Sequence, residues 1–312
     1  ATINDLIEDK IPIGDWNKHI KNENDVFVNI SSIAFLLTGK IVEEKPQENK
    51  NILVKMVKNL SGPLLRNAIK QAINILAKQF VFERDIKKAI KQSDNKKNDK
   101  YTFSFDMLGE AAVTYEDSER YYSQYEEAIL QTGKSLNPHK KSISIKLSSL
   151  HPRYERNKFD LLKKELLPKI FKLVELGREN KVDICIDAEE ADRLNLSLFM
   201  FKDIIESKLI DNVYHGFGFA IQAYQKRTFF LLDWLNDYLQ SVDKKINIRL
   251  VKGAYWDTEI KIAQEEGFEN YPVFTKKFAT DISYLACAHK LLVNKNIFSQ
   301  FATHNAHSIS YI

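Results

Sequence analysis

The chain has 312 residues, of which 44% are hydrophobic, and its 46 basic and 42 acidic side chains leave a formal net charge of +4. This length suits one α/β barrel with an appendage, and the hydrophobic content is ordinary for a protein with a packed core. No apolar run is long enough to cross a bilayer, and the chain does not open with a signal peptide. Two cysteines, Cys185 and Cys287, indicate no disulfide framework, so we expect a reducing, cytoplasmic setting.

Residues 1–100 are predicted to form an N-terminal helical region. Segment 61–81 is typical, because Ser61 can cap a helix and apolar residues follow it at helical spacing. A shorter helix is predicted at 28–37. The lysine-rich stretch at 87–100 has the composition of a solvated helix end and linker, and basic and acidic residues are interspersed along the chain. We therefore expect no nucleic-acid binding by this chain.

Residues 101–312 are predicted to form a series of alternating strands and helices. Six β-rich runs begin roughly 30 to 50 residues apart, which is the length of a βα unit. Helical stretches such as 161–179 and 272–292 lie between them. The runs are apolar rather than alternating, which favours parallel strands buried on both faces. The six runs are 103–108, 142–147, 182–187, 216–221, 246–251 and 299–303.

Nearly every run ends in a polar or charged residue. These residues are Asp106, Lys146, Asp187 with Glu189, Gln222, Arg249 with Lys252, and Thr303 with His304. In a (βα) barrel the carboxyl ends of the strands converge on one mouth, where catalysis takes place, whereas a doubly wound sheet gathers such groups at one switch point. The pattern favours a (βα)8 barrel of the TIM type, although six strands do not close an eight-stranded barrel.

The segment RLVKGAYW, at 249–256, is the densest cluster of candidate residues. Its arginine and lysine can hold phosphate or an anionic flavin ring, its glycine allows close backbone approach, and its aromatic pair can stack on a ring. The alternative is a structural ion pair with a buried aromatic anchor. The glycines of GFGFAI, at 216–221, lie inside a strand-like run rather than in a turn, which argues against a dinucleotide fingerprint there.

Several carboxylates follow the third run, namely Asp187, Glu189, Glu190 and Asp192. Asp187 and Glu189 share a face of an extended strand, so they can act as general acid and base or as metal ligands. The alternative is a charge network with Lys146 and Arg249 that fills the mouth. No metal site is predicted, because the two histidines of THNAH at 303–307 lack further ligands at a suitable spacing. The chain contains neither a nucleophile elbow nor a P-loop.

Six segments together resemble the proline dehydrogenase domain of bacterial proline utilisation A flavoproteins. They occur in the family's order and cover most of the chain, with a further helical likeness at 27–40. RLVKGAYWD and SIKLSSLHPRY are long enough to be specific. The segments are FDMLGEAA (105–112), SIKLSSLHPRY (144–154), IDAEEADRL (186–194), GFAIQAYQKR (218–227), RLVKGAYWD (249–257) and FATHNAH (301–307).

The resemblance implies a distorted (βα)8 barrel that holds FAD without a covalent bond. It implies oxidation of L-proline to Δ1-pyrroline-5-carboxylate, the first step of proline catabolism, with hydride passing from proline C5 to flavin N5 and electrons then passing to a quinone. It further implies a cytoplasmic protein, with peripheral association at the inner membrane as an option. A pyrroline-5-carboxylate dehydrogenase domain is expected in the same full-length polypeptide.

The resemblance also assigns roles to individual residues. Arg249 is expected near flavin N5, and Lys146 and Asp187 are expected on the substrate side, all three as catalytic residues. Ala254 and Tyr255 are expected to contact both substrate and cofactor. The other expected cofactor contacts are Gln222, Val251, Lys252, Gly253 and Trp256, with Thr275, Lys276, Thr303, His304 and Asn305 at the ribityl, phosphate or adenine parts.

The chain departs from the family pattern in what it lacks. The last two barrel strands and the helix that carries a carboxylate-binding arginine pair are absent, so we expect the protein to continue past Ile312. Neither an aldehyde dehydrogenase domain nor an N-terminal DNA-binding domain is recognised in these residues. Two rival functions stay open: a Schiff-base aldolase that uses Lys146 or Lys252 as nucleophile, and a non-catalytic binding or regulatory module whose charged mouth is structural.

Overall fold

The computed structural model describes residues 81–312, except 99, 108, 110, 137, 138, 140, 212 and 213. The chain divides into two compact units, Ala1–Arg84 and Asp85–Ile312, and the strands and helices named here all belong to the second. The helix predicted at 28–37, and all but the last residue of the one predicted at 61–81, lie outside the described residues.

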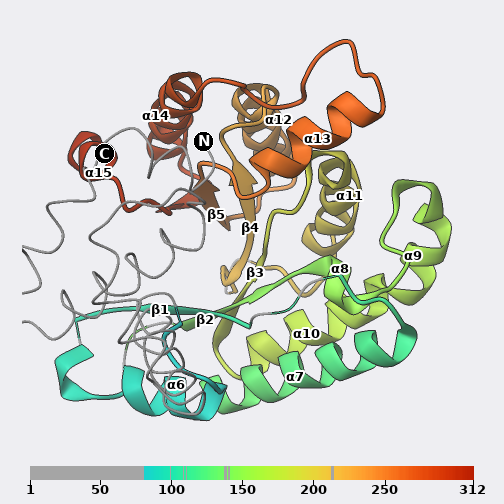
Figure 1. Ribbon diagram of the computed structural model, residues 1–312. Helices are drawn as coiled ribbons and strands as arrows, with labels where there is room; N and C mark the ends of the chain where they lie inside the picture. Colours follow the sequence, from blue (N-terminus) through green and yellow to red (C-terminus); the bar gives the residue numbers. More distant parts are fainter. Residues whose placement is uncertain are drawn as a thin grey trace, which may run out of the picture. The chain divides into compact units, whose positions relative to one another are not determined.

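One parallel sheet of six strands forms the centre of the described unit (Figure 1). Each strand pairs with the next one along the chain, so the order is β1-β2-β3-β4-β5-β6, as in a barrel and unlike a doubly wound sheet. The strands correspond to the six predicted runs and form a half-barrel. Their bounds are Phe103–Asp106 (β1), Lys141–Ile145 (β2), Val182–Ile186 (β3), Phe217–Gln222 (β4), Ile246–Val251 (β5) and Ile297–Phe301 (β6).

Helices connect successive strands and lie outside the curved sheet in Figure 1. The first long one, α7, begins with a capping box in which Thr114 and Asp117 exchange side-chain and backbone hydrogen bonds. The helices are α6 (Ile86–Ser93), α7 (Tyr115–Gly133), α8 (Leu147–Leu150), α9 (Phe159–Glu165), α10 (Leu167–Glu179), α11 (Leu194–Ile205), α12 (Thr228–Ser241), α13 (Trp256–Glu265), α14 (Lys277–Val293) and α15 (Ala306–Tyr311), with 3-10 turns at Lys96–Asn98, Arg156–Lys158 and Ala191–Arg193.

Two predicted helices differ from the structure. The stretch 161–179 is two helices, α9 and α10, and a proline occupies the first turn of the second. The helix predicted at 272–292 begins later, at Lys277. The residues expected to form its first turn instead pair with the segment after β4. Val273 forms a β-bridge with Gln225, and the N–H of Phe274 donates to a backbone carbonyl of that segment.

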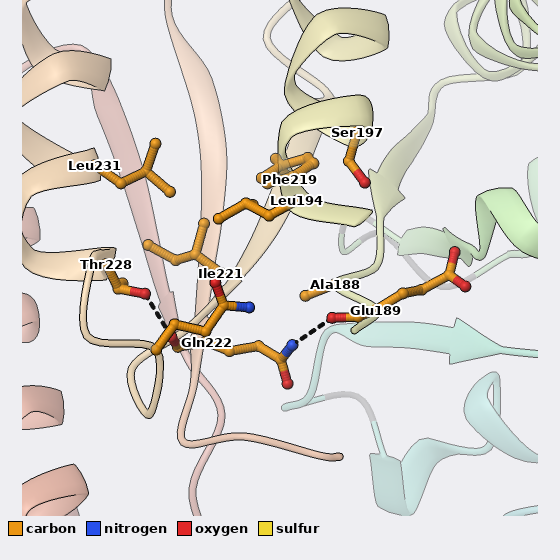
Figure 2. Close-up of a pocket in the computed structure, with 10 residues that line it drawn as sticks. Ala188, Glu189, Leu194, Ser197, Phe219, Ile221, Gln222, Thr228 and Leu231 are labelled. Atoms are coloured by element: carbon orange, nitrogen blue, oxygen red, sulfur yellow. Dashed lines mark hydrogen bonds between the residues drawn. The ribbon is translucent and has the colours of Figure 1, made fainter. Parts of the chain in front are cut away.

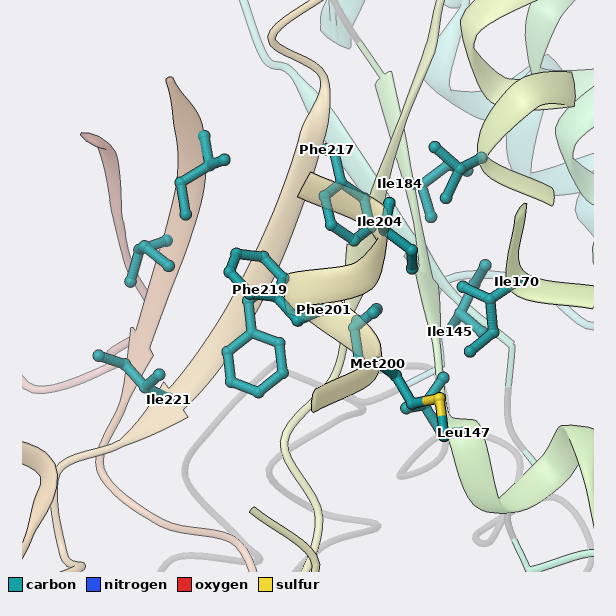
Figure 3. Close-up of a cluster of buried hydrophobic side chains, with 14 of the residues drawn as sticks. Ile145, Leu147, Ile170, Ile184, Met200, Phe201, Ile204, Phe217, Phe219 and Ile221 are labelled. Atoms are coloured by element: carbon teal, nitrogen blue, oxygen red, sulfur yellow. The ribbon is translucent and has the colours of Figure 1, made fainter. Parts of the chain in front are cut away.

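The sheet has two chemically different faces. On one face, bulky apolar side chains of β2 to β6 pack under the helices, and Figure 3 shows Ile184, Phe217 and Phe219 against Phe201 and Met200 of α11. The intervening residues of the same strands point to the other face and are mostly small or polar. The runs therefore alternate in chemistry rather than being continuously apolar, but the strands are parallel, and β2 to β5 are largely buried on both faces, as expected. Serine, glycine, alanine and cysteine inside the runs obscured the alternation.

Candidate active site

Arg249 lies in the middle of β5 and its side chain crosses the face of the sheet that the helices do not cover. Its guanidinium donates to Ser104 Oγ of β1 at 2.5 Å, to Ser144 Oγ of β2 at 2.7 Å and to Gln300 Oε1 of β6 at 3.2 Å. It also donates to Asp187 Oδ1 at 3.3 Å, just beyond β3. One side chain thus joins four other strands or strand ends, which uses the fixed fork of five donors that only arginine has.

Lys146 follows β2 and lies between two carboxylates. Its ammonium is 2.9 Å and 3.1 Å from the two carboxylate oxygens of Asp106 and 3.3 Å from Asp187 Oδ2. The side chains of Lys146, Asp187 and Arg249 are only 13%, 16% and 15% exposed, so water screens their interactions weakly. The four charged residues form one network, hereafter the charge network: Asp106, Lys146, Asp187 and Arg249.

The charge network shifts the acidity of its members. Burial works against the ammonium of Lys146, but the carboxylates of Asp187 and Asp106 outweigh it and raise the pKa of Lys146 above its ordinary value. Burial also raises the pKa of Asp187, and Asp106 adds to this effect while Lys146 and Arg249 oppose it. Lys146 is therefore a permanent cation in this environment, suited to hold an anion rather than to accept a proton.

The segment from Lys252 to Trp256 follows β5 and turns sharply into α13. Gly253 has a φ of 159°, and a side chain there would lie 2.4 Å from the ring of Tyr224, so the position admits only glycine. The N–H of Ala254 donates to Gln222 Oε1 at 2.9 Å, and the indole of Trp256 donates to the carbonyl of Phe274 at 2.9 Å. The backbone of this loop is thus fixed from two sides.

Gln222, at the end of β4, ties two loops together. Its side-chain N–H donates to the Glu189 carbonyl at 2.7 Å, while its side-chain oxygen accepts from Ala254. Figure 2 shows Gln222 beside a cavity of about 10 Å³, which has room for about one water molecule. Gln222 is buried, and its two hydrogen bonds fix the loop that carries Ala254.

The two carboxylates predicted to act together have different partners. Asp187 belongs to the charge network, whereas the buried Glu189 accepts from the Ser148 N–H at 3.0 Å and pairs with Arg193 at 2.8 Å. Glu189 is therefore not placed beside Asp187 as a general acid–base partner. The network interpretation, with Asp187 joined to Lys146 and Arg249, describes the geometry.

The remaining predicted residues lie around the same ends of the strands but outside the charge network. Val251 ends β5, and Lys252 pairs with Asp281 of α14 at 2.5 Å. Thr275 and Lys276 are exposed and directly precede α14, while Thr303 and His304 follow β6. Asn305 caps α15 by accepting from Ser308, so part of its polar capacity is already used.

Three partners of the charge network, Ser104, Ser144 and Gln300, were missed as site residues. Its member Asp106 was recognised as a strand-end residue but not as a site residue. The signal was present in the period of two that the strands follow. Ser104 and Asp106 alternate with phenylalanines, and Ser144 and Lys146 alternate with isoleucines. Register supports the same grouping, because Arg249 is the direct neighbour of Gln300 in the sheet.

Comparison with known proteins agrees with this geometry. A half-barrel with charged side chains at the carboxyl ends of its strands has the layout of a barrel enzyme. A sequence model described as proline dehydrogenase matches residues 89–312. The chain belongs to the proline dehydrogenase family.

Relatives and solved structures extend the likeness over nearly the whole chain. Bifunctional protein PutA of Klebsiella aerogenes is 44% identical over 319 residues, which cover 100% of this chain and 24% of the relative. A crystal structure of proline utilization A from Bradyrhizobium japonicum has a TM-score of 0.72 at 38% identity, covering 95% of this chain and 31% of that one. For the protein from Bdellovibrio bacteriovorus the TM-score is 0.77 at 25% identity, covering 96% and 34%. The chain spans about a quarter of the length of the curated relatives it matches.

A second match corrects an expectation about the N-terminal part. A sequence model described as the DNA-binding domain of proline dehydrogenase matches residues 1–80. The expectation that no such domain occurs in these residues is therefore wrong at the level of the domain family, and the exclusion of nucleic acid loses its support. Helical periodicity predicts a helical region, but it does not distinguish DNA-binding helices from others, and charge interspersion was too coarse a criterion.

Proposed function

We propose that the polypeptide containing this chain oxidises L-proline to Δ1-pyrroline-5-carboxylate with bound FAD. The observation that carries the proposal is the charge network, in which Lys146 and Asp187, directly after β2 and β3, are joined to Arg249 of β5 in a parallel half-barrel of the proline dehydrogenase family. When bound, the flavin would supply the two-electron redox chemistry that oxidises the substrate.

The residues of this chain fit a flavin in charge and shape. Three of the four side chains that accept hydrogen bonds from Arg249 are neutral, so the positive charge of its guanidinium is only partly compensated. The remaining charge is available to stabilise a reduced, anionic flavin ring. The segment from Lys252 to Trp256 offers exposed backbone at Gly253 and Ala254 beside the half-buried ring of Tyr255. We assign the exposed side chains of Thr275, Lys276 and His304, with Thr303 and Asn305, to the ribityl, phosphate and adenine parts.

On the substrate side, the chain's own groups bind rather than transfer protons. Lys146 is held as a cation by Asp106 and Asp187, so it can pair with the carboxylate of proline. The raised pKa of Lys146 argues against a role as general base, because a base must be unprotonated at working pH. No general base is needed if proline binds with its amine already unprotonated.

The Schiff-base alternative has weaker support in the same network. An aldolase lysine needs a depressed pKa to attack a carbonyl, whereas the two carboxylates raise that of Lys146. The other candidate, Lys252, is paired with Asp281 at 2.5 Å. Borohydride added with a carbonyl substrate should therefore trap no adduct at either lysine, and a trapped adduct would revive the aldolase.

Partners of the whole protein follow from the relatives. The PutA relatives are described as bifunctional, and this chain spans about a quarter of their length, so we place a pyrroline-5-carboxylate dehydrogenase domain elsewhere in the polypeptide. We assign electron transfer to a membrane quinone, reached by peripheral association. Among the described residues, no helix is both long enough and apolar enough to cross a membrane.

The test uses the full-length polypeptide. Purified protein should show a flavin spectrum, and L-proline added without oxygen should bleach it, with D-proline as the matched control. Protein that holds no flavin, or flavin that L-proline leaves oxidised, would overturn the proposal.

A further inference from the structure

We propose that Glu259 is a positioning residue that fixes the loop from Lys252 to Trp256 in its cofactor-binding shape. The inference rests on the proposed function and adds a residue that the family likeness did not assign. Glu259 lies in the first turn of α13, directly after that loop, yet its side chain is directed inward and only 5% of the residue is exposed. A buried carboxylate is costly unless its partners compensate, so those partners identify its role.

One carboxylate oxygen of Glu259 accepts two hydrogen bonds from two other loops. The N–H of Ala191, after β3, lies 2.6 Å from Glu259 Oε1, and the hydroxyl of Tyr224, after β4, lies 3.3 Å from the same atom. A residue of α13 is thereby bound to the loops that follow β3 and β4. The loops after three successive strands meet at one charged acceptor.

Tyr224 carries this restraint to the backbone of the candidate cofactor loop. Its hydroxyl receives a hydrogen bond from the backbone of Tyr255, and its ring lies against Gly253, where no side chain would fit. The N–H of Tyr224 donates to the carbonyl of Lys252 at 2.8 Å. The path from Glu259 through Tyr224 therefore reaches three residues of the segment from Lys252 to Trp256.

The loop after β3 is held in the same way from its other side. Arg227 donates to the carbonyl of Ala191, whose N–H is bound by Glu259, so both polar groups of Ala191 are fixed. Ala191 follows Asp187 by four residues, so the restrained loop is the one that continues from the charge network. Burial raises the pKa of Glu259, and the hydrogen bonds from Ala191 and Tyr224 oppose that rise, so both partners favour the anionic form, which is the stronger acceptor.

The experiment measures FAD binding to full-length apoprotein by fluorescence titration in matched variants. Glu259→Ala should raise the Kd for FAD about tenfold or more, because two hydrogen bonds to a charged acceptor are lost. Tyr224→Phe keeps the ring against Gly253, removes only the hydroxyl, and should raise the Kd by about fivefold. Both variants should alter the visible circular dichroism of bound flavin, which reports the shape of its surroundings.

Two controls separate positioning from general weakening. Leu239→Ala removes a buried side chain near the end of α12 and should lower thermal stability while the Kd stays within about twofold. Glu266→Gln changes an exposed carboxylate directly after α13 and should change neither quantity. Double replacement of Glu259 and Tyr224 should cost little more than Glu259→Ala alone.

The outcomes distinguish this inference from the proposed function. Wild-type protein that binds FAD, with Glu259→Ala and Tyr224→Phe binding it equally well, would overturn the role of Glu259 and leave the flavin proposal standing. A Kd that rises as much in Leu239→Ala would also overturn it, because the effect would then follow stability alone. Wild-type protein that binds no FAD would overturn both proposals.

Discussion

The two faces of the sheet are built from the same strands but have different roles. The face under the helices is a continuous apolar layer in which Ile145, Ile184 and Phe219 are excluded from water. The opposite face carries Arg249 and Lys146, held by hydroxyls, amides and carboxylates from other strands. Because side chains alternate along a strand, residues that pack the apolar layer lie next to residues that build the charge network.

The difference shows where substitutions are tolerated. The apolar layer is stabilised by many individually weak packing contacts, so it depends on volume and shape. The polar face depends on a few specific partners, and loss of one leaves the others buried without compensation. Stability and chemistry should therefore be separable by mutating neighbouring positions.

The largest effect is expected for Phe219→Ala on the apolar face. Phe219 is fully buried and its ring centroid lies 5.2 Å from that of Phe201, so truncation leaves a cavity. We expect a loss of about 3–5 kcal/mol in the free energy of unfolding, measured by urea denaturation. Turnover per folded molecule should stay near wild type. Ser144→Ala, on the polar face, is the matched control and should cost about 1 kcal/mol but reduce turnover. If Phe219→Ala lowered turnover and Ser144→Ala lowered mainly stability, the proposed division between the two faces would be wrong.

A double-mutant cycle on Lys146 and Asp187 sharpens the description of the polar face. If Asp187 holds Lys146, then Lys146→Met and Asp187→Asn should each lower kcat/KM for proline by about tenfold or more, and the double variant should lose little more. The exposed ion pair Lys87–Glu127 is the control and should show almost no coupling. Additive losses at Lys146 and Asp187 would mean that the two act independently.

The order of the strands was predictable, whereas the membership of the network was only partly so. Strand–helix alternation and polar residues after Phe105, Ile145 and Ile186 were enough to predict a barrel and its active end. The partners of Arg249 could not be predicted, because Ser104 is 145 residues away in sequence and a serine by itself does not indicate a functional site. Contacts between distant strands depend on register, which a single sequence does not specify.

The smallest effect is expected for the alkylation of Cys185, which should hardly proceed in the native protein. Burial raises the pKa of this thiol to about 12, so at pH 8 about one molecule in ten thousand carries the reactive thiolate. Alkylation of the native protein at pH 8 should therefore be very slow, and rapid once urea unfolds it, as mass spectrometry of the labelled peptide can show. Rapid labelling of the native protein would mean that the polar face opens to solvent around Cys185.

The reduction potential of the bound flavin in Arg249→Met tests the central claim most directly, namely that the charge network acts on the flavin. Loss of the cation should destabilise the reduced ring and lower the potential by about 30–60 mV, the equivalent of one charged hydrogen bond in a two-electron couple. Arg249→Lys, which keeps the charge, should shift it less. Potentiometry at full flavin occupancy decides the matter: a lower potential in Arg249→Met supports the account, and a potential equal to that of wild type contradicts it.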